Sequence, residues 1–248
     1  MRTSNPALNA KTFTGFGSTT DVAHGMSIQG TVNKTILLLL IALLAAGWTW
    51  NLYYATGNAD AVKWWVISGA FGGLVVAIVT IYKKQWASVT APIYALFEGF
   101  LLGGISAIFE AQFPRIVIQA VSLTYGIFFC LLLAYKSRLL QATQNFKLGV
   151  VSATGGIALF YLAAFFLGLF GIQIPFIHES GVIGIGFSLI VVIIAALNLV
   201  LDFDFIESGA AQGAAKYMEW YAAFGLMVTL IWLYVEILKL LAKIRRRR

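Results

Sequence analysis

Four acidic residues stand in stretches of the sequence that are otherwise apolar: Glu98, Asp202, Asp204 and Glu236. A carboxylate inside a hydrocarbon layer costs roughly 3 kcal/mol or more unless it is protonated, paired or in contact with water. Acids in this setting therefore mark candidate positions for sensing protons or binding ions.

Two such acids on adjacent helices have the chemistry of a proton-driven switch. Two carboxylates within hydrogen-bonding reach share one proton more readily than they ionise together. Removing that proton replaces a hydrogen bond by two repelling charges, which is enough to separate the helices. Carboxylate oxygens are also ligands that Ca²⁺ accepts. The acids are therefore candidates for sensing protons and for supplying oxygen ligands of the kind that Ca²⁺ accepts.

Each acid also has a simpler interpretation. Asp202 and Asp204 fit a helix end at the level of the lipid headgroups, and Glu236 fits an i to i+3 pair with Lys239 whose side chains reach toward the interface. Glu98 fits a protonated side chain hydrogen-bonded to a neighbouring helix. The spacing of Gly99 and Gly103 beside it favours close packing of two helices through small residues.

The elements that would carry these acids follow from composition. The 248 residues are 60% hydrophobic and 11% charged, with a mean hydropathy of +0.87. These values exclude an ordinary soluble domain, a disordered chain and a nucleic-acid-binding domain. Because about 20 apolar residues cross the hydrocarbon layer, we predict an all-α bundle of seven transmembrane helices. The predicted spans are residues 35–53, 64–82, 91–109, 116–135, 148–171, 181–201 and 221–244.

The domain organisation predicted from these spans is simple. Residues 1–33 are polar, and we predict that they form a flexible arm with no cleavable signal peptide. Residues 34–244 are predicted to form the seven-helix domain, and residues 245–248 a basic tail. With the N-terminus in the cytoplasm, nine Lys and Arg residues lie on the cytoplasmic side and eight on the other. This narrow excess favours a cytoplasmic N-terminus.

Four stretches of the sequence resemble the Bax inhibitor-1 family of seven-helix membrane proteins, especially its bacterial members. They are the opening Ser4–Leu8, the segment Ala95–Ser106 around Glu98, the acidic segment Leu199–Phe205, and Leu233–Glu236, where Glu236 replaces the usual Asp of a Leu-Tyr-x-Asp motif. The resemblance implies a multi-pass protein of the bacterial inner (plasma) membrane, with the seventh helix at the centre of the bundle.

The resemblance also implies a function. It implies that a di-carboxylate pair between helices six and seven senses pH and gates a calcium leak. By matching motifs, Asp202 takes the sixth-helix role and Glu236 the seventh-helix role. Asp202 and Asp204 point about 200° apart on a helix, so only one of them faces Glu236, and we choose Asp202. The other members of the site are supporting residues, namely Asp204, Glu98, and Lys83 or Lys84 as the basic residue that latches the closed pair.

Further expectations concern the connector and the partners. The segment 207–220 is long, and Gly209 and Gly213 within it permit a turn at the membrane interface. The predicted protein is not an enzyme and needs no cofactor. Its predicted partners are the lipid bilayer, Ca²⁺ and protons, with no nucleic acid.

Three other functions compete with the leak. A non-catalytic regulator would bind a membrane protease or another membrane protein through the arm of residues 1–33. A retinal protein would use Lys239 as its Schiff-base lysine, although a lysine this late in the helix is better explained by reaching the interface. An intramembrane hydrolase is weaker still, because His24 and His178, the latter beside Glu179, lie outside any Gly-x-Ser-x-Gly or His-Glu-x-x-His motif.

Overall fold

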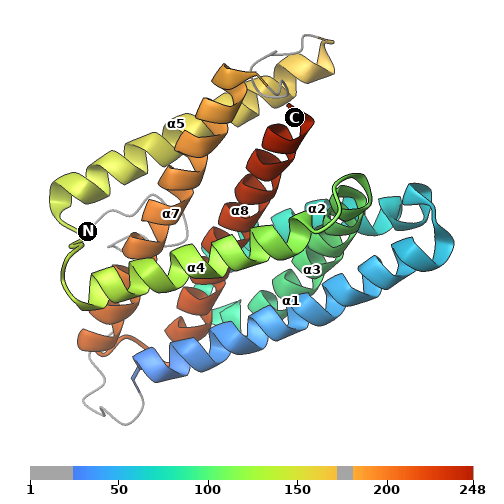
Figure 1. Ribbon diagram of the computed structural model, residues 1–248. Coiled ribbons are helices and arrows are strands. Elements are labelled where there is room, and N and C mark those ends of the chain that lie inside the picture. Colours follow the sequence, from blue (N-terminus) through green and yellow to red (C-terminus); the bar gives the residue numbers. More distant parts are fainter. Residues whose placement is uncertain (1–24, 172–180, 248) are drawn as a thin grey trace. The chain divides into compact units, whose positions relative to one another are not determined.

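The computed structural model describes residues 25–171 and 181–247. Within these residues the chain forms seven helices long and apolar enough to cross a membrane, and no strand (Figure 1). The predicted all-α, seven-span membrane fold is therefore confirmed. The long helices are α1 (Ile28–Thr56), α2 (Ala59–Tyr82), α3 (Ala87–Gln112), α4 (Ile116–Lys136), α5 (Gln144–Leu169), α7 (Val182–Ala211) and α8 (Met218–Arg246), and a short 3-10 helix, η3 (Lys84–Trp86), precedes α3.

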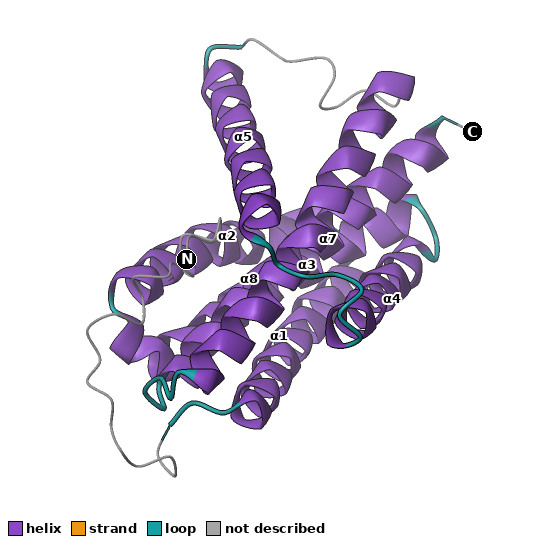
Figure 2. Cartoon of the chain, turned by 90° about the vertical axis from the view of Figure 1, so that its left-hand side faces the viewer, coloured by secondary structure: helices purple, strands orange, loops and turns teal. Residues whose placement is uncertain are grey.

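Several helix starts have a local cause in the sequence. The Ser27 hydroxyl accepts a hydrogen bond from the Gly30 N–H, and Asn58 and Thr143 cap α2 and α5 in the same way. Such caps satisfy backbone donors that have no partner within the helix. The connector between α4 and α5, residues 137–143, is a short loop (Figure 2).

Both ends of the predicted helical domain differ from the structure. Helix α1 begins at Ile28, so residues 28–33 of the predicted polar arm belong to the first helix. Helix α8 includes Arg245 and Arg246 of the predicted basic tail. The described part of the arm is thus confined to residues 25–27.

The chain divides into two compact units. In its described residues, unit 1 holds 115–171, 181–204 and 229–247, and unit 2 holds 25–114 and 205–228. Helices α7 and α8 each contribute to both units. The candidate acids Asp202, Asp204 and Glu236 fall in unit 1, and Glu98 falls in unit 2.

In unit 2, helix α3 packs closely against α1 and α2. A side-chain carbon at Gly99 would lie 2.5 Å from the Ala42 carbonyl oxygen, and one at Gly103 would overlap the Thr49 hydroxyl. On the α2 side, a side-chain carbon at Gly69 would lie 2.6 Å from the Phe97 carbonyl oxygen. The glycines therefore allow backbone-to-backbone approach, which confirms the packing role predicted for Gly99 and Gly103.

In unit 1, aromatic side chains join α4 and α5 to α7. The Phe203 ring of α7 lies 5.6 Å from the Phe128 ring and 5.8 Å from the Tyr135 ring of α4, between centroids. Phe187, also on α7, lies 5.2 Å from Phe160 of α5. Ring separations in this range are those of favourable aromatic pairs.

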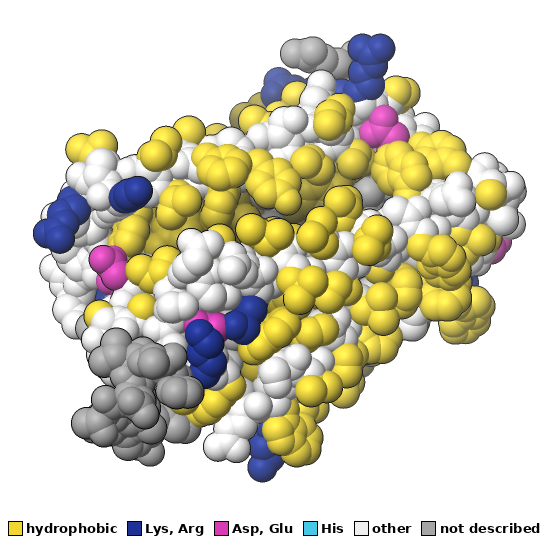
Figure 3. Space-filling view, turned by 90° about the horizontal axis from the view of Figure 1, so that it is seen from below, with side chains coloured by type: hydrophobic (Ala, Val, Ile, Leu, Met, Phe, Trp, Pro, Cys, Tyr) yellow, Lys and Arg dark blue, Asp and Glu magenta, His cyan; other side chains and the backbone are white. Residues whose placement is uncertain are grey.

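Burial differs strongly among the helices. In an 18-residue apolar stretch of each helix, 56% of the stretch is buried in α8 and 11% in α5. The value for α8 is the highest of the seven helices. The space-filling view shows apolar side chains over most of the face that it presents, as a lipid-facing surface requires (Figure 3).

The close approach at Gly99 predicts a cost for a single methyl group. In Gly99→Ala the new carbon meets the Ala42 carbonyl and the Ala45 side chain, so we expect a loss of about 1–3 kcal/mol in the free energy of unfolding. Gly126→Ala is the matched control, because nothing lies within 4 Å of its new carbon. Thermal unfolding of both variants in detergent measures the difference. Equal midpoints for the two variants would contradict the packing.

Candidate functional site

The two acids of α7 have different surroundings. The Asp202 side chain is buried, with 1% of the residue exposed. Asp204 forms an ion pair with Lys147 of α5, at 2.5 Å between Nζ and Oδ2. Helix α7 continues for seven residues beyond Asp204 to Ala211, so the interpretation of Asp202 and Asp204 as a helix end is wrong. Asp204 is a partner of α5, as its different direction from Asp202 allows.

Glu236 is also buried, with 2% of the residue exposed, and its carboxylate has two partners. Oε2 accepts a hydrogen bond from the Tyr161 hydroxyl of α5 at 3.2 Å, and Oε1 pairs with the Lys239 ammonium at 3.0 Å. The same ammonium lies 5.4 Å from the centre of the Tyr161 ring. The i to i+3 pair predicted as the simpler interpretation is therefore present, and a tyrosine from another helix completes it.

The register of α7 against α8 decides whether Asp202 and Glu236 meet. The Lys243 ammonium of α8 donates to the Ser188 hydroxyl at 2.8 Å and to the Gly184 carbonyl at 3.2 Å. Seven residues separate Lys243 from Glu236, which is about 10 Å of helix at 1.5 Å per residue. Glu236 is thus level with α7 near Ile193, about 10–15 Å along the axis from Asp202.

This offset argues against the predicted direct pair. Two carboxylates share a proton only when their oxygens lie about 2.5–2.7 Å apart. The physical reason is the length of α7, which continues nine residues past Asp202 before the connector 212–217 begins. The expected long connector 207–220 is correspondingly wrong, because most of it is helical. Asp202 and Glu236 are better described as separate buried acids at different depths.

The same offset bears on the predicted Ca²⁺ site at Asp202 and Glu236. Calcium ligands lie 2.3–2.6 Å from the ion, so on this register one ion would not contact both acids, and a Ca²⁺ site at either acid stays a prediction. Within residues 25–171 and 181–247, no group of three or more His, Cys, Asp or Glu side chains is placed to hold a metal. The histidines His24 and His178, with Glu179, lie outside the described residues.

A regular set of polar contacts joins α5 to α7 and α8 in unit 1. Besides the Lys147–Asp204 and Tyr161–Glu236 contacts, the Asn198 amide of α7 donates to the Thr154 hydroxyl of α5 at 2.8 Å. The α5 members are therefore Lys147, Thr154 and Tyr161, which recur every seven residues and lie on one helix face. We call these three contacts the polar series; along α5 it extends for about 21 Å.

The other predicted supporting residues lie in unit 2. Glu98 of α3 accepts a hydrogen bond from Tyr94 on the same helix. Its Oε1 also lies 3.1 Å from where a side-chain carbon at Gly73 of α2 would be. Lys84 lies over the ring of Tyr221, 5.6 Å from its centre, and Lys83 is exposed at the end of α2. Each of these residues thus has its own surroundings in unit 2.

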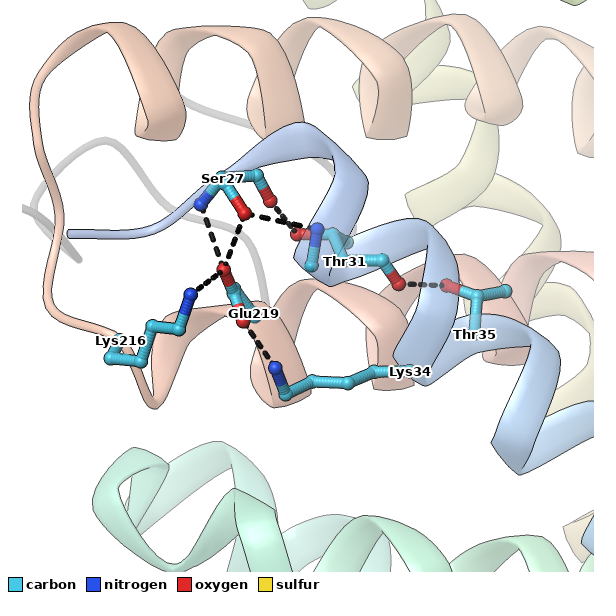
Figure 4. Close-up of polar contacts among 7 residues, drawn as sticks. Ser27, Thr31, Lys34, Thr35, Lys216 and Glu219 are labelled. Carbon is cyan, nitrogen blue, oxygen red and sulfur yellow. Dashed lines mark hydrogen bonds and ion pairs between the residues drawn. The ribbon is translucent and has the colours of Figure 1, made fainter. Parts of the chain in front are cut away.

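Sequence reasoning missed Glu219, the most enclosed acid of the described chain. It is fully buried in the first turn of α8, and its Oε1 accepts from the Ser27 N–H at 2.9 Å, the Ser27 hydroxyl at 2.8 Å and Lys216 at 2.8 Å. Its Oε2 pairs with Lys34 of α1. Figure 4 shows these groups converging on the carboxylate from both sides. The backbone pairing of Met26 with Ala214 adds to this attachment of residues 25–27.

Comparison with known proteins identifies one family. Residues 5–246 match the model of the family described as Bax inhibitor 1 like. No curated protein and no solved structure matches the chain.

Glu219 makes a direct prediction for stability. Glu219→Leu leaves the Lys34 ammonium partly buried without its carboxylate, so we expect a loss of about 3–5 kcal/mol in the free energy of unfolding. Adding Lys34→Met should recover part of that loss, because no charge of this pair is then left unpaired. Thermal unfolding in detergent measures both, with Asp60→Asn, an exposed acid, as control. A double variant no more stable than Glu219→Leu would contradict the ion-pair account.

Proposed function

Because the chain belongs to the Bax inhibitor 1 like family, we propose that this multi-pass membrane protein is a pH-sensitive calcium leak that catalyses no reaction. We place it in the bacterial inner membrane, with the lipid bilayer, Ca²⁺ and protons as its partners. The proposal keeps Asp202 and Glu236 as the proton-sensing residues. It treats them as two acids at different depths rather than as one pair.

The observation that carries the proposal is the burial of both acids inside long apolar helices. Asp202 is 1% exposed and Glu236 is 2% exposed. The most apolar stretches of their helices have mean hydropathies of 2.7 in α7 and 1.9 in α8. When a buried acid in such a helix gains or loses a proton, the free energy of the packed helices changes by a large amount. Its protonation therefore affects how the helices pack. Proton binding at these positions is therefore expected to change the structure.

The polar series supports a route for a cation. Its three contacts supply side-chain oxygens from Asp204, Thr154, Tyr161 and Glu236 at successive levels. Oxygen ligands suit Ca²⁺. These oxygens are spread over about 21 Å, and the hydrocarbon layer is about 30 Å thick. They therefore provide several weak sites in place of one strong site. Ions pass more readily along several weak sites than through a single tight one.

The ion pairs within the series offer a means of closing it. The Lys147 ammonium forms an ion pair with Asp204, and the Lys239 ammonium forms one with Glu236. A bound ammonium competes with Ca²⁺ for the same oxygens, so these lysines act in the proposal as internal counter-ions. This role replaces the one predicted for Lys83 and Lys84.

Calcium flux into proteoliposomes at pH 6, 7 and 8 tests the proposal. We expect wild-type flux to vary with pH, and Asp202→Asn and Glu236→Gln each to remove part of that variation, because neither new side chain titrates. Separate acids should have additive effects on the logarithm of the flux, so the double variant should lose more than either single variant. Asp60→Asn, at an exposed acid, is the control and should keep the wild-type profile.

Two results would count against this account in different ways. If either single variant abolished the whole pH dependence and the double variant added nothing, the two acids would be one coupled pair. If wild-type protein gave no flux above empty liposomes at any pH, the leak would be refuted. The regulator of a membrane protease would then be the stronger hypothesis, and deleting residues 1–24 would test its dependence on the arm, which lies almost wholly outside the described residues.

A further inference from the structure

Three lysines from three different segments of unit 2 surround the first turn of α8. Lys34 comes from α1, Lys84 from η3, and Lys216 from the connector that precedes α8. We call them the lysine cluster. Lys34 pairs with Glu219 and lies 5.5 Å from the Trp220 ring centre, while Lys84 lies 5.6 Å from that of Tyr221. Consecutive residues of one helix turn thus hold the cluster together.

The cluster carries more positive charge than its neighbours neutralise. Two of its ammonium groups, those of Lys34 and Lys216, pair with the single carboxylate of Glu219, and Lys84 adds a third positive charge, which leaves an excess of two. Lys83 next to Lys84 and Glu207 on α7 add one charge of each sign in the same unit, so the excess is unchanged. Within the described residues, Lys84 makes no ion pair at all.

Donors for a further acceptor remain at this position. An ammonium group has three N–H donors, and the Lys216 side chain, 56% exposed, uses one of them on Glu219. The Tyr221 hydroxyl is buried without a hydrogen-bond partner in the described part of the chain, although such groups ordinarily have one. The first turn of α8 therefore combines excess positive charge with unused donors.

The depth of the cluster indicates which anion is available to it. Helices α1 and α8 have 29 residues each, about 43 Å of helix, so their ends extend beyond a hydrocarbon layer of about 30 Å. Lys216 and Lys84 stand just outside the ends of α8 and α3, where phospholipid headgroups lie. Trp220 and Tyr217, beside them, are of the residue types that settle at this level.

We propose that the lysine cluster binds the headgroup phosphate of an anionic phospholipid at the first turn of α8. The phosphate oxygens accept hydrogen bonds from Lys216, Lys84 contributes positive charge from the Tyr221 side of the turn, and the acyl chains extend along the apolar outer faces of the helices. Lys34 remains with Glu219 and contributes charge. This site is independent of the leak proposed above, because every one of its residues lies in unit 2.

Titration of the purified full chain with phosphatidylglycerol, read by native mass spectrometry, tests the site. We expect wild type to retain phosphatidylglycerol in preference to phosphatidylcholine. Lys84→Gln/Lys216→Gln should bind it about 25-fold more weakly, since each lysine near an anionic headgroup contributes about a fivefold effect. Lys84→Arg/Lys216→Arg should retain binding. Lys63→Gln/Lys136→Gln, which removes two exposed lysines elsewhere, should match wild type.

Several outcomes would overturn the site. Unchanged phosphatidylglycerol binding in Lys84→Gln/Lys216→Gln would do so, as would an equal loss in the Lys63→Gln/Lys136→Gln control. Displacement of the lipid by excess inorganic phosphate would identify a site for a soluble anion instead. If the double variant did not fold, Lys84→Gln alone would serve, because it breaks no ion pair, and it should still weaken binding about fivefold.

Discussion

A charged or polar side chain inside a membrane-spanning helix has to find its partner on the protein, because the hydrocarbon layer offers none. The structure of unit 1 follows from this constraint. Lys147, Tyr161 and Lys239 each contact an acid, and Asn198 contacts Thr154. These contacts hold α5 against α7 and α8 in one register. The same register offsets Asp202 from Glu236 along the helix axes, and the proposed leak therefore treats them as two separate acids.

Unit 2 obeys the same constraint at the edge of the hydrocarbon layer. There a single carboxylate, Glu219, accepts from Ser27, Lys34 and Lys216 and so attaches the start of α1 to the start of α8. Deeper in this unit, glycines replace polar contacts, and α3 approaches α1 through Gly99 and Gly103. Unit 2 therefore joins its helices by ionic contacts at the start of α8 and by close steric packing along α3.

The sequence was sufficient to predict what depends on apolar length and on single residues. Seven spans, the burial of Asp202 and Glu236 and the packing role of Gly99 could all be predicted, because each depends on its local context. The partners of the acids could not, since they depend on how two helices are aligned. One signal was available, namely the seven-residue spacing of Lys147, Thr154 and Tyr161 within an apolar stretch.

The predicted direct Asp202–Glu236 pair depended on where α7 ends. The glycines at 209 and 213 suggested an early turn, but the backbone is left-handed only at Gly213, with φ of 62°, and Gly209 remains helical. A glycine within a helix costs only about 1 kcal/mol relative to alanine, which burial of the helix readily offsets. The additional helix moves Asp202 away from the connector and from the level of Glu236.

The most direct test of this account is thiol cross-linking of α7 to α8 in the membrane. On a Cys130→Ser background, which removes the single native cysteine, the pair Ser188→Cys and Lys243→Cys is compared with the pair Asp202→Cys and Glu236→Cys. The register predicts that a short bifunctional reagent joins the first pair and not the second. Efficient cross-linking of positions 202 and 236, with none between 188 and 243, would contradict it.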